Sequence, residues 1–167
     1  KGDLRYVTEA GFRDFEDAVV VEAADTLLAA YETHQRARMA AFLPGRPYAR
    51  ILAERSLILQ LGENVFVHGG VLPEHLDYGI DRMNDETRAW MRGEMERPEF
   101  LQGSASPQWT RLYSDEPDSS ACATLHQVLA SLEAKRLIVG HTVQDHITVG
   151  CSGRVWRVDV GLAAYYG

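Results

Sequence analysis

The distribution of apolar and polar residues predicts two β-strands that each run into a turn carrying histidine and glycine. Residues 65–67 are apolar and lead to His68 and two glycines, and the apolar residues 137–139, which follow Arg136, lead to a glycine and His141. Glycine accepts backbone angles that other residues resist, so each pattern indicates a strand that ends in a sharp turn. Ligands of open α/β sheets bind at such strand ends, which makes both histidines candidates for one site.

Apolar periodicity predicts the other elements. A helix is expected over residues 12–41, because apolar side chains recur at three- and four-residue steps at Phe12, Phe15, Val19, Ala23, Leu27 and Tyr31. We also expect strands at 51–53 and 56–61, a hairpin over 59–67, helices over 73–92 and from a cap at Ser119 or Ser120 to Lys135, and a hairpin over 147–160. The alternation of helices and strands predicts an α/β fold. Residues 94–106 are expected to form a loop of a length that often binds ligands.

The two strand-end histidines have two interpretations. Neutral imidazole is a common ligand of zinc, manganese and iron, and carboxylates usually complete the shell, so His68 and His141 can share one ion. Each can equally be a hydrogen-bonded structural residue, since spacing alone does not establish convergence. We interpret His75 as a surface residue, His126 as solvated and His146 as a neighbour of the site that does not ligate.

Two further side chains are candidates for the same site. Arg111 can hold two phosphoryl oxygens through its guanidinium, or it can form a surface ion pair with Asp115 or Glu116. Asp159 lies between two valines and is expected to be buried, where it either orients a ligating histidine or makes a structural hydrogen bond. Trp109 is interpreted as a packing residue.

The motifs VHGG (67–70), VGHT (139–142) and GRVWRVDVG (153–161), with a tryptophan-arginine segment between the first two, resemble a known family. They are similar to the C-terminal half of the calcineurin-like metallophosphoesterases, most of all to the Shewanella-like branch of the phosphoprotein phosphatases. The resemblance runs from residue 64 to 167, and residues 1–7 resemble the segment after the family's Gly-Asn-His-Glu motif. It implies a bacterial phosphatase and a layered β-sandwich flanked by helices. In that interpretation residues 1–167 form a single partial domain, with a helical insertion at about residues 8–47.

The resemblance also implies a chemistry. Two divalent ions, of manganese, iron or zinc, activate a hydroxide that hydrolyses a phosphomonoester, with phosphoproteins among the candidate substrates. His68 and His141 would bind the second ion, Gly69 and Arg111 would contact substrate, and Arg111 would stabilise the developing charge. Asp159 would form a hydrogen bond with a ligating histidine and so orient its ring.

The family's first three motifs, Asp-x-His, Gly-Asp-x-x-Asp-Arg-Gly and Gly-Asn-His-Glu, are absent from these residues. The chain therefore carries a partial site. We expect it to be inactive alone and to associate with its missing N-terminal half or with itself, because a divided sheet exposes apolar surface. Two alternatives stay open: a non-catalytic binding module that retains a half-site, and a hydrolase of dinucleoside polyphosphates or other small phosphoesters.

Composition and net charge limit the classes of partner that the chain is expected to bind. With 46% hydrophobic and 25% charged residues the chain is typical of a soluble globular protein, and a net charge of -7 favours neither nucleic acid nor a membrane surface as partner. We see no signal peptide and no run of eighteen apolar residues. Cys122 and Cys151 lack the spacing of metal ligands, and the sequence does not decide whether they form a disulfide. The compartment, cytoplasmic or periplasmic, is left undecided.

Overall fold

The computed structural model describes residues 4–15 and 26–166. These residues form two compact units. The first contains residues up to 55 together with 88–96 and 163–166, and the second contains residues 56–87 and 97–162. The second unit carries the candidate site.

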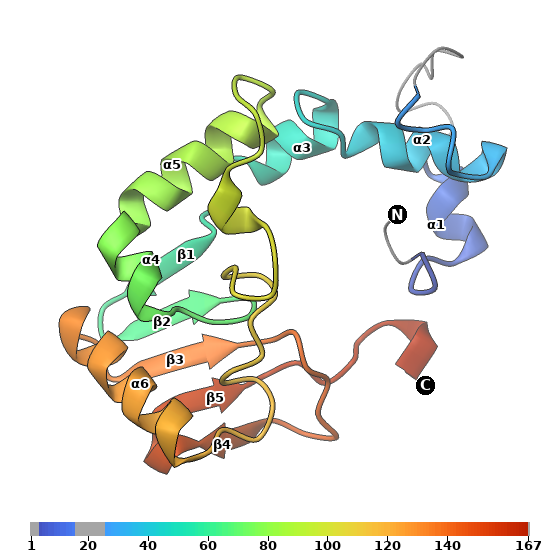
Figure 1. Ribbon diagram of the computed structural model, residues 1–167. Helices are drawn as coiled ribbons and strands as arrows, with labels where there is room; N and C mark the ends of the chain where they lie inside the picture. Colours follow the sequence, from blue (N-terminus) through green and yellow to red (C-terminus); the bar gives the residue numbers. More distant parts are fainter. Residues whose placement is uncertain (1–3, 16–25, 167) are drawn as a thin grey trace. The chain divides into compact units, whose positions relative to one another are not determined.

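The second unit is built on a mixed sheet of five strands (Figure 1). The strands are β1 (Ile58–Leu61), β2 (Asn64–Val67), β3 (Arg136–Val139), β4 (Thr148–Gly150) and β5 (Val155–Arg157), in the spatial order β1-β2-β3-β5-β4. The β1–β2 and β4–β5 pairs are antiparallel hairpins, whereas β2, β3 and β5 run parallel to one another. The predicted α/β class and both predicted hairpins are confirmed.

Helices connect these strands. α4 (Pro73–Tyr78) and α5 (Ile80–Met91) are separated at Gly79, whose φ of 98° interrupts the predicted continuous helix. A short 3₁₀ helix, Glu99–Leu101, lies within the predicted loop. α6 (Ser119–Ser131) is capped by the Asp118 carboxylate, which accepts a hydrogen bond from the Ala121 amide at 2.8 Å, so the prediction of a serine cap was wrong by one or two positions.

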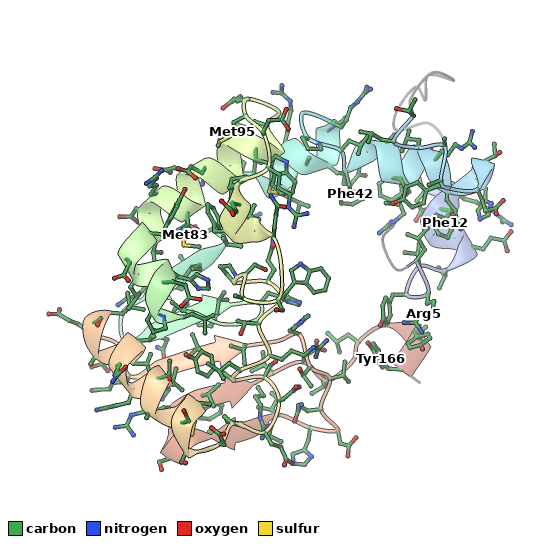
Figure 2. The ribbon with its side chains drawn as sticks, viewed as in Figure 1. Arg5, Phe12, Phe42, Met83, Met95 and Tyr166 are labelled. Atoms are coloured by element: carbon green, nitrogen blue, oxygen red, sulfur yellow. A yellow bond between two sulfur atoms is a disulfide. The ribbon has the colours of Figure 1, made fainter. Side chains whose placement is uncertain are left out.

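The core of the second unit lies against one face of the sheet. It is made by alternate strand residues and by residues of the covering helices, namely Val65, Val67, Leu137, Val139, Val155, Met83, Leu125, Val128 and Leu129. Figure 2 shows Met83 on α5. Asn84, one residue further along α5, holds the edge strand β1: its amide accepts from the Ile58 N–H at 3.0 Å and donates to the Ile58 carbonyl at 2.9 Å.

A disulfide joins Cys122 of α6 to Cys151, the first residue of the 3₁₀ turn Cys151–Gly153 that links β4 to β5. The sequence did not decide whether this disulfide forms. In the folded chain the first turn of α6 lies next to the end of β4, which brings the two sulfur atoms together across a sequence separation of 29.

The first unit contains α1 (Glu9–Arg13), α2 (Thr33–Ala41), α3 (Pro47–Leu52) and the 3₁₀ turn Ala164–Tyr166. The prediction of one helix over residues 12–41 was wrong in its described part, because residues 26–30 form turns and α2 restarts after Glu32. The Glu32 amide donates to the Gln35 side chain at 3.2 Å, which favours a new helix start there. Val19 and Ala23 lie outside the described residues.

The predicted strand at 51–53 was also wrong, since Ile51 and Leu52 belong to α3. Pro47 occupies the first helical position, where its fixed φ favours a helix, and a short apolar run fits a helix as well as a strand. Within the described ranges, no helix has both the length and the apolar character needed to cross a bilayer.

Candidate functional site

Two histidines meet at the C-terminal ends of two neighbouring strands of the sheet. β2 and β3 are parallel neighbours in which Val67 pairs with Val139, so the residues that follow these strands leave the sheet at the same edge. Nδ1 of His141 lies 3.2 Å from Nε2 of His68, and the ring centroids are 5.0 Å apart. The amide of Gly140 donates to the His68 carbonyl at 2.9 Å and so continues the pairing beyond the strands. The convergence that the sequence left open is present.

The backbone of His141 is held in an unusual conformation. Its φ of 68° lies in the left-handed region, which costs a non-glycine residue on the order of 1 kcal/mol. The Arg111 guanidinium donates to the His141 carbonyl at 3.2 Å and supports this turn. Strained residues cluster at functional sites, and this one brings the imidazole to within hydrogen-bond distance of the ring of His68.

The two glycines after His68 let another segment approach the backbone. A Cβ on Gly69 would lie 2.7 Å from the Thr110 carbonyl oxygen and 2.9 Å from that of Pro107, and a Cβ on Gly70 would lie 2.8 Å from the Tyr113 ring. The amides of both glycines donate to the Pro107 carbonyl, at 2.8 and 3.0 Å. Glycine at these positions therefore positions the 107–113 segment beside the histidines. Substrate contact by Gly69 stays a prediction.

Arg111 lies beside the histidine pair in a polar network. It donates to the Thr142 hydroxyl at 2.6 Å, and that hydroxyl donates to the Asp115 carboxylate at 2.8 Å. The direct ion pair between Arg111 and Asp115 is long, at 3.9 Å. The surface ion pair with Asp115 is thus present but weak, and half of the Arg111 side chain is exposed. Phosphoryl binding by Arg111 stays a prediction.

Asp159 is only partly buried, which corrects the expectation drawn from its flanking valines. The residues after β5 belong to no helix or strand, and the valines on either side of Asp159 are exposed. The Asp159 carboxylate accepts a hydrogen bond from the Gly161 amide at 3.0 Å. Burial lowers the pKa of His68 and the negative charge of Asp159 opposes that lowering, so Asp159 is electrostatically coupled to the ring. Its role in orienting His68 stays a prediction.

Both imidazoles favour the neutral form. Burial lowers the pKa of His68 below its ordinary value, with Arg111 acting in the same direction and Asp159 opposing it. Burial, Arg111 and His68 together lower the pKa of His141, and the Trp109 backbone and Asp115 oppose this. A neutral imidazole keeps a lone pair on one ring nitrogen, as binding of a cation requires.

A cavity of about 550 Å³ adjoins His141. It is lined by Arg97, Gln102, Gly103, Ser104, Trp109, Arg111 and His141. Trp109 is 55% exposed and its ring lies edge-on to His141 at a centroid distance of 5.4 Å, so its interpretation as a packing residue was wrong. The sequence indicated Arg97, Gln102 and Ser104 only as members of the candidate binding loop at residues 94–106.

The other histidines considered from the sequence lie outside the cavity. His126 is exposed, as expected, and His146 is exposed too; neither lines the cavity. His75 is buried, contrary to prediction: its Nδ1 accepts from the Leu72 amide at 3.0 Å, and its Nε2 lies 3.0 Å from the Ala105 carbonyl. Since Nδ1 accepts, the neutral ring carries its proton on Nε2 and donates it to Ala105. His75 thereby fastens the start of α4 to the loop beside the cavity.

The histidine pair fits a divalent cation as part of a larger ligand set. Two nitrogens bound ~2.1 Å from one ion at angles between a right angle and the tetrahedral angle are separated by ~3.0–3.4 Å, and the observed separation is 3.2 Å. Among residues 4–15 and 26–166 no three histidine, cysteine or acidic side chains are grouped so as to hold a metal. The described residues thus offer two nitrogen ligands, and a complete shell needs others.

Comparison with known proteins shows that the chain is similar to phosphatases. No protein-family model matches the chain. The chain is 39% identical over 135 residues to Shewanella-like protein phosphatase 2 of Arabidopsis thaliana, a match that covers 77% of this chain and 34% of the relative. It is also 29% identical over 107 residues to an uncharacterised protein of Schizosaccharomyces pombe, covering 60% of this chain and 32% of that protein.

Solved structures of phosphatases are also similar to this chain. A crystal structure of a cold-active protein tyrosine phosphatase from a psychrophilic Shewanella species superimposes with a TM-score of 0.58 at 25% identity, covering 77% of this chain and 44% of that one. A second structure of a cold-active protein tyrosine phosphatase gives the same TM-score and identity and is covered to 43%. The chain is thus homologous to phosphatases, and it spans about a third of the length of the two curated relatives named above and less than half of these solved chains.

Proposed function

We propose that this chain forms part of a metal-dependent phosphoesterase in which His68 and His141 bind one divalent ion. The observation that carries the proposal is the 3.2 Å separation of Nε2 of His68 and Nδ1 of His141, two neutral-favouring nitrogens at the edge of a sheet. Similarity to proteins named as phosphatases supports the reaction class. The ions, when bound, would supply Lewis-acid polarisation of the phosphoryl group and would lower the pKa of an attacking water.

Arg111 is suited to bind the phosphoryl oxygens. Its guanidinium is half exposed beside His141, and Thr142 and Asp115 limit its orientations through the 2.6 and 2.8 Å hydrogen bonds. A pre-oriented guanidinium stabilises the charge that develops on equatorial oxygens at no cost of reorganisation. Asp159 would keep the His68 ring oriented.

We propose a phosphorylated protein side chain as substrate. The cavity of about 550 Å³ is of a size that holds a side chain with its neighbouring residues. Arg97 and Arg111 bring positive charge to it, and the exposed Trp109 offers an aromatic wall. The solved relatives are named as tyrosine phosphatases, which favours phosphotyrosine over the dinucleoside polyphosphates that the sequence left open.

The test uses the longest native polypeptide that contains these residues. Phosphate release from p-nitrophenyl phosphate and from a phosphotyrosine peptide is measured with manganese and with chelator, for the wild type and for His68→Ala, His141→Ala and the matched control His126→Ala. Because loss of an outer-shell partner alone costs roughly 10–100-fold, we expect at least ~100-fold slower turnover in the first two variants and an unchanged rate in the control. Equal rates in all four proteins would refute the assignment. Tight peptide binding by the wild type without turnover would instead indicate a binding module.

A further inference from the structure

The Arg111 guanidinium divides its hydrogen-bond donors between the protein and the cavity. Its Nη1 donates to the Thr142 hydroxyl at 2.6 Å and to the His141 carbonyl at 3.2 Å. An Nη nitrogen carries two hydrogens, so these bonds use the whole donor capacity of Nη1. Among the described residues none accepts a hydrogen bond from Nε or Nη2, and half of the side chain is exposed. Because Arg111 lines the cavity, its Nε–Nη2 edge is the part left for a ligand.

The Nε–Nη2 edge has the geometry that a phosphoryl group requires. The N–H bonds along this edge lie in one plane and point the same way, so they can donate in parallel to two oxygens of one phosphoryl group. The guanidinium is planar and rigid, and the two acceptors of Nη1 therefore fix the direction of the opposite edge as well. The Thr142 hydroxyl is the nearer of these two acceptors.

The Thr142 hydroxyl makes every hydrogen bond of which it is capable. A hydroxyl has one hydrogen and two lone pairs. The hydrogen goes to the Asp115 carboxylate at 2.8 Å, because a carboxylate only accepts. Since that hydrogen is engaged, the Ser114 hydroxyl, also 2.8 Å away, must donate to Thr142. The lone pairs thus accept from Ser114 and from Arg111, and the hydroxyl cannot rotate without breaking one of three bonds.

The partners of the Thr142 hydroxyl are themselves fixed by the fold. Ser114 is fully buried. The backbone of Asp115 is held by Arg157 of β5, whose Nη1 donates to the Asp115 carbonyl at 2.7 Å. Thr142 directly follows His141 in the turn after β3. One turn therefore carries a candidate metal ligand and the side chain that fixes the neighbouring guanidinium.

We propose that Thr142 is a positioning residue, and that its hydroxyl orients the Nε–Nη2 edge of Arg111 toward the phosphoryl group of the substrate. This inference rests on the proposed function and adds which atoms of Arg111 contact the phosphoryl group and which residue sets their direction. An edge that is oriented before the substrate arrives needs no reorganisation as charge develops on the equatorial oxygens. Without the hydroxyl, Nη1 keeps the His141 carbonyl alone, at 3.2 Å, and the guanidinium can turn about that bond.

The experiment is a double-mutant cycle of Thr142→Val and Arg111→Lys in the longest native polypeptide that contains these residues, with p-nitrophenyl phosphate and manganese. We expect Thr142→Val to lower kcat/KM by about 10–100-fold, because a displacement of about 1 Å in a positioning contact has an effect of this size. In the Arg111→Lys background the same change should alter kcat/KM by less than about twofold, since no guanidinium edge is left to orient.

Two matched variants separate the hydroxyl from the fold. Thr142→Ser keeps the hydroxyl and should restore kcat/KM to within about threefold of the wild type. Thr124→Val makes the same change on α6, where the hydroxyl donates to the Ser120 carbonyl at 3.1 Å, and should leave the rate unchanged. If circular dichroism shows that Thr142→Val is unfolded, Asp115→Ala takes its place in the cycle. That change is at an exposed position, and it removes the acceptor of the Thr142 hydrogen.

The identity of the binding edge has a readout that does not depend on turnover. Nitrogen-detected NMR of the guanidinium groups follows the addition of inorganic phosphate, and Arg111→Lys identifies the resonances of Arg111. Nε and Nη2 should shift most and should saturate together, whereas Nη1 stays bonded to the protein. A largest shift at Nη1, or no shift at any nitrogen of Arg111, would overturn the assignment of the edge.

The outcomes distinguish this inference from the proposed function. A slow Arg111→Lys enzyme together with Thr142→Val at the wild-type rate would overturn the positioning role alone. An equal loss from Thr142→Val in both backgrounds would overturn it too, because Thr142 would then act on the fold and not through Arg111. Wild-type rates in His68→Ala and His141→Ala would refute the proposed function, and this inference with it.

Discussion

Replacing Gly69 by alanine should destabilise the second unit, because the position touches backbone on the facing segment. The added Cβ would lie 2.7 Å from the Thr110 carbonyl oxygen, 2.9 Å from the Pro107 carbonyl oxygen and 3.0 Å from the Gln108 carbonyl carbon. None of these atoms is the end of a flexible side chain. The 107–110 segment therefore has to move away from the strand end, and it carries Trp109 with it.

The cost follows from two contributions. Overpacking of a filled site costs about 1–3 kcal/mol. The same movement lengthens the hydrogen bonds from the Gly69 and Gly70 amides to the Pro107 carbonyl, now 2.8 and 3.0 Å, and each contributes about 0.5–1.5 kcal/mol. Partial relaxation keeps the total below the sum of the upper limits, so we expect a loss of about 2–4 kcal/mol in the free energy of unfolding.

Urea unfolding followed by circular dichroism measures this loss. The matched control is Gly140→Ala, at the equivalent strand end before His141, where the nearest atom to the new Cβ would be 3.5 Å away. It should change the free energy of unfolding by less than about 1 kcal/mol. A Gly69→Ala protein as stable as the wild type, or a control that is destabilised equally, would refute the argument that close backbone contact explains Gly69.

Three other predictions follow from single contacts. Asn84→Ala removes both hydrogen bonds to the Ile58 backbone and should cost about 2–4 kcal/mol in urea unfolding, whereas Asn84→Asp, which keeps the acceptor, should cost less. Burial lowers the pKa of His75 below 6.5, so the unfolded chain binds the proton more tightly. The stability that neutral His75 contributes is complete above pH 6.5, and it is lost as the pH falls toward the lowered pKa of the folded protein. Glu74 opposes the shift in part. His75→Gln should flatten this slope in unfolding curves between about pH 5 and pH 8, and an unaltered slope would contradict the assignment. Arg111→Lys should raise KM for p-nitrophenyl phosphate and lower kcat by roughly 10–100-fold with metal content unchanged, because lysine cannot hold two oxygens in one plane; a loss of metal would instead show that Arg111 acts through His141.

The sequence predicted the parts of the site that depend on local pattern. Apolar runs that end in glycine and histidine identified β2 and β3, and the parallel pairing of these strands brings His68 and His141 together, a convergence that the sequence had left open. The fold class and the hairpins followed from the same alternation.

The errors have physical causes that a local pattern does not contain. A short apolar run such as Ile51–Leu52 fits either a helix or a strand, and Pro47 decided for the helix. The burial of His75 depends on the Ala105 carbonyl, 30 residues away, and the disulfide depends on how α6 packs. Trp109 reaches the cavity because the 107–113 segment follows the strand end at Gly69 and Gly70, which only the folded chain shows.

The central claim is that His68 and His141 share one divalent ion, and a nitrogen-detected NMR titration of the imidazole rings with zinc tests it most directly. The account predicts that Nε2 of His68 and Nδ1 of His141, the two atoms now 3.2 Å apart, shift together and saturate with one ion, while the exposed ring of His126 does not respond. Shifts at the opposite nitrogens, at one ring alone, or at neither ring would contradict it.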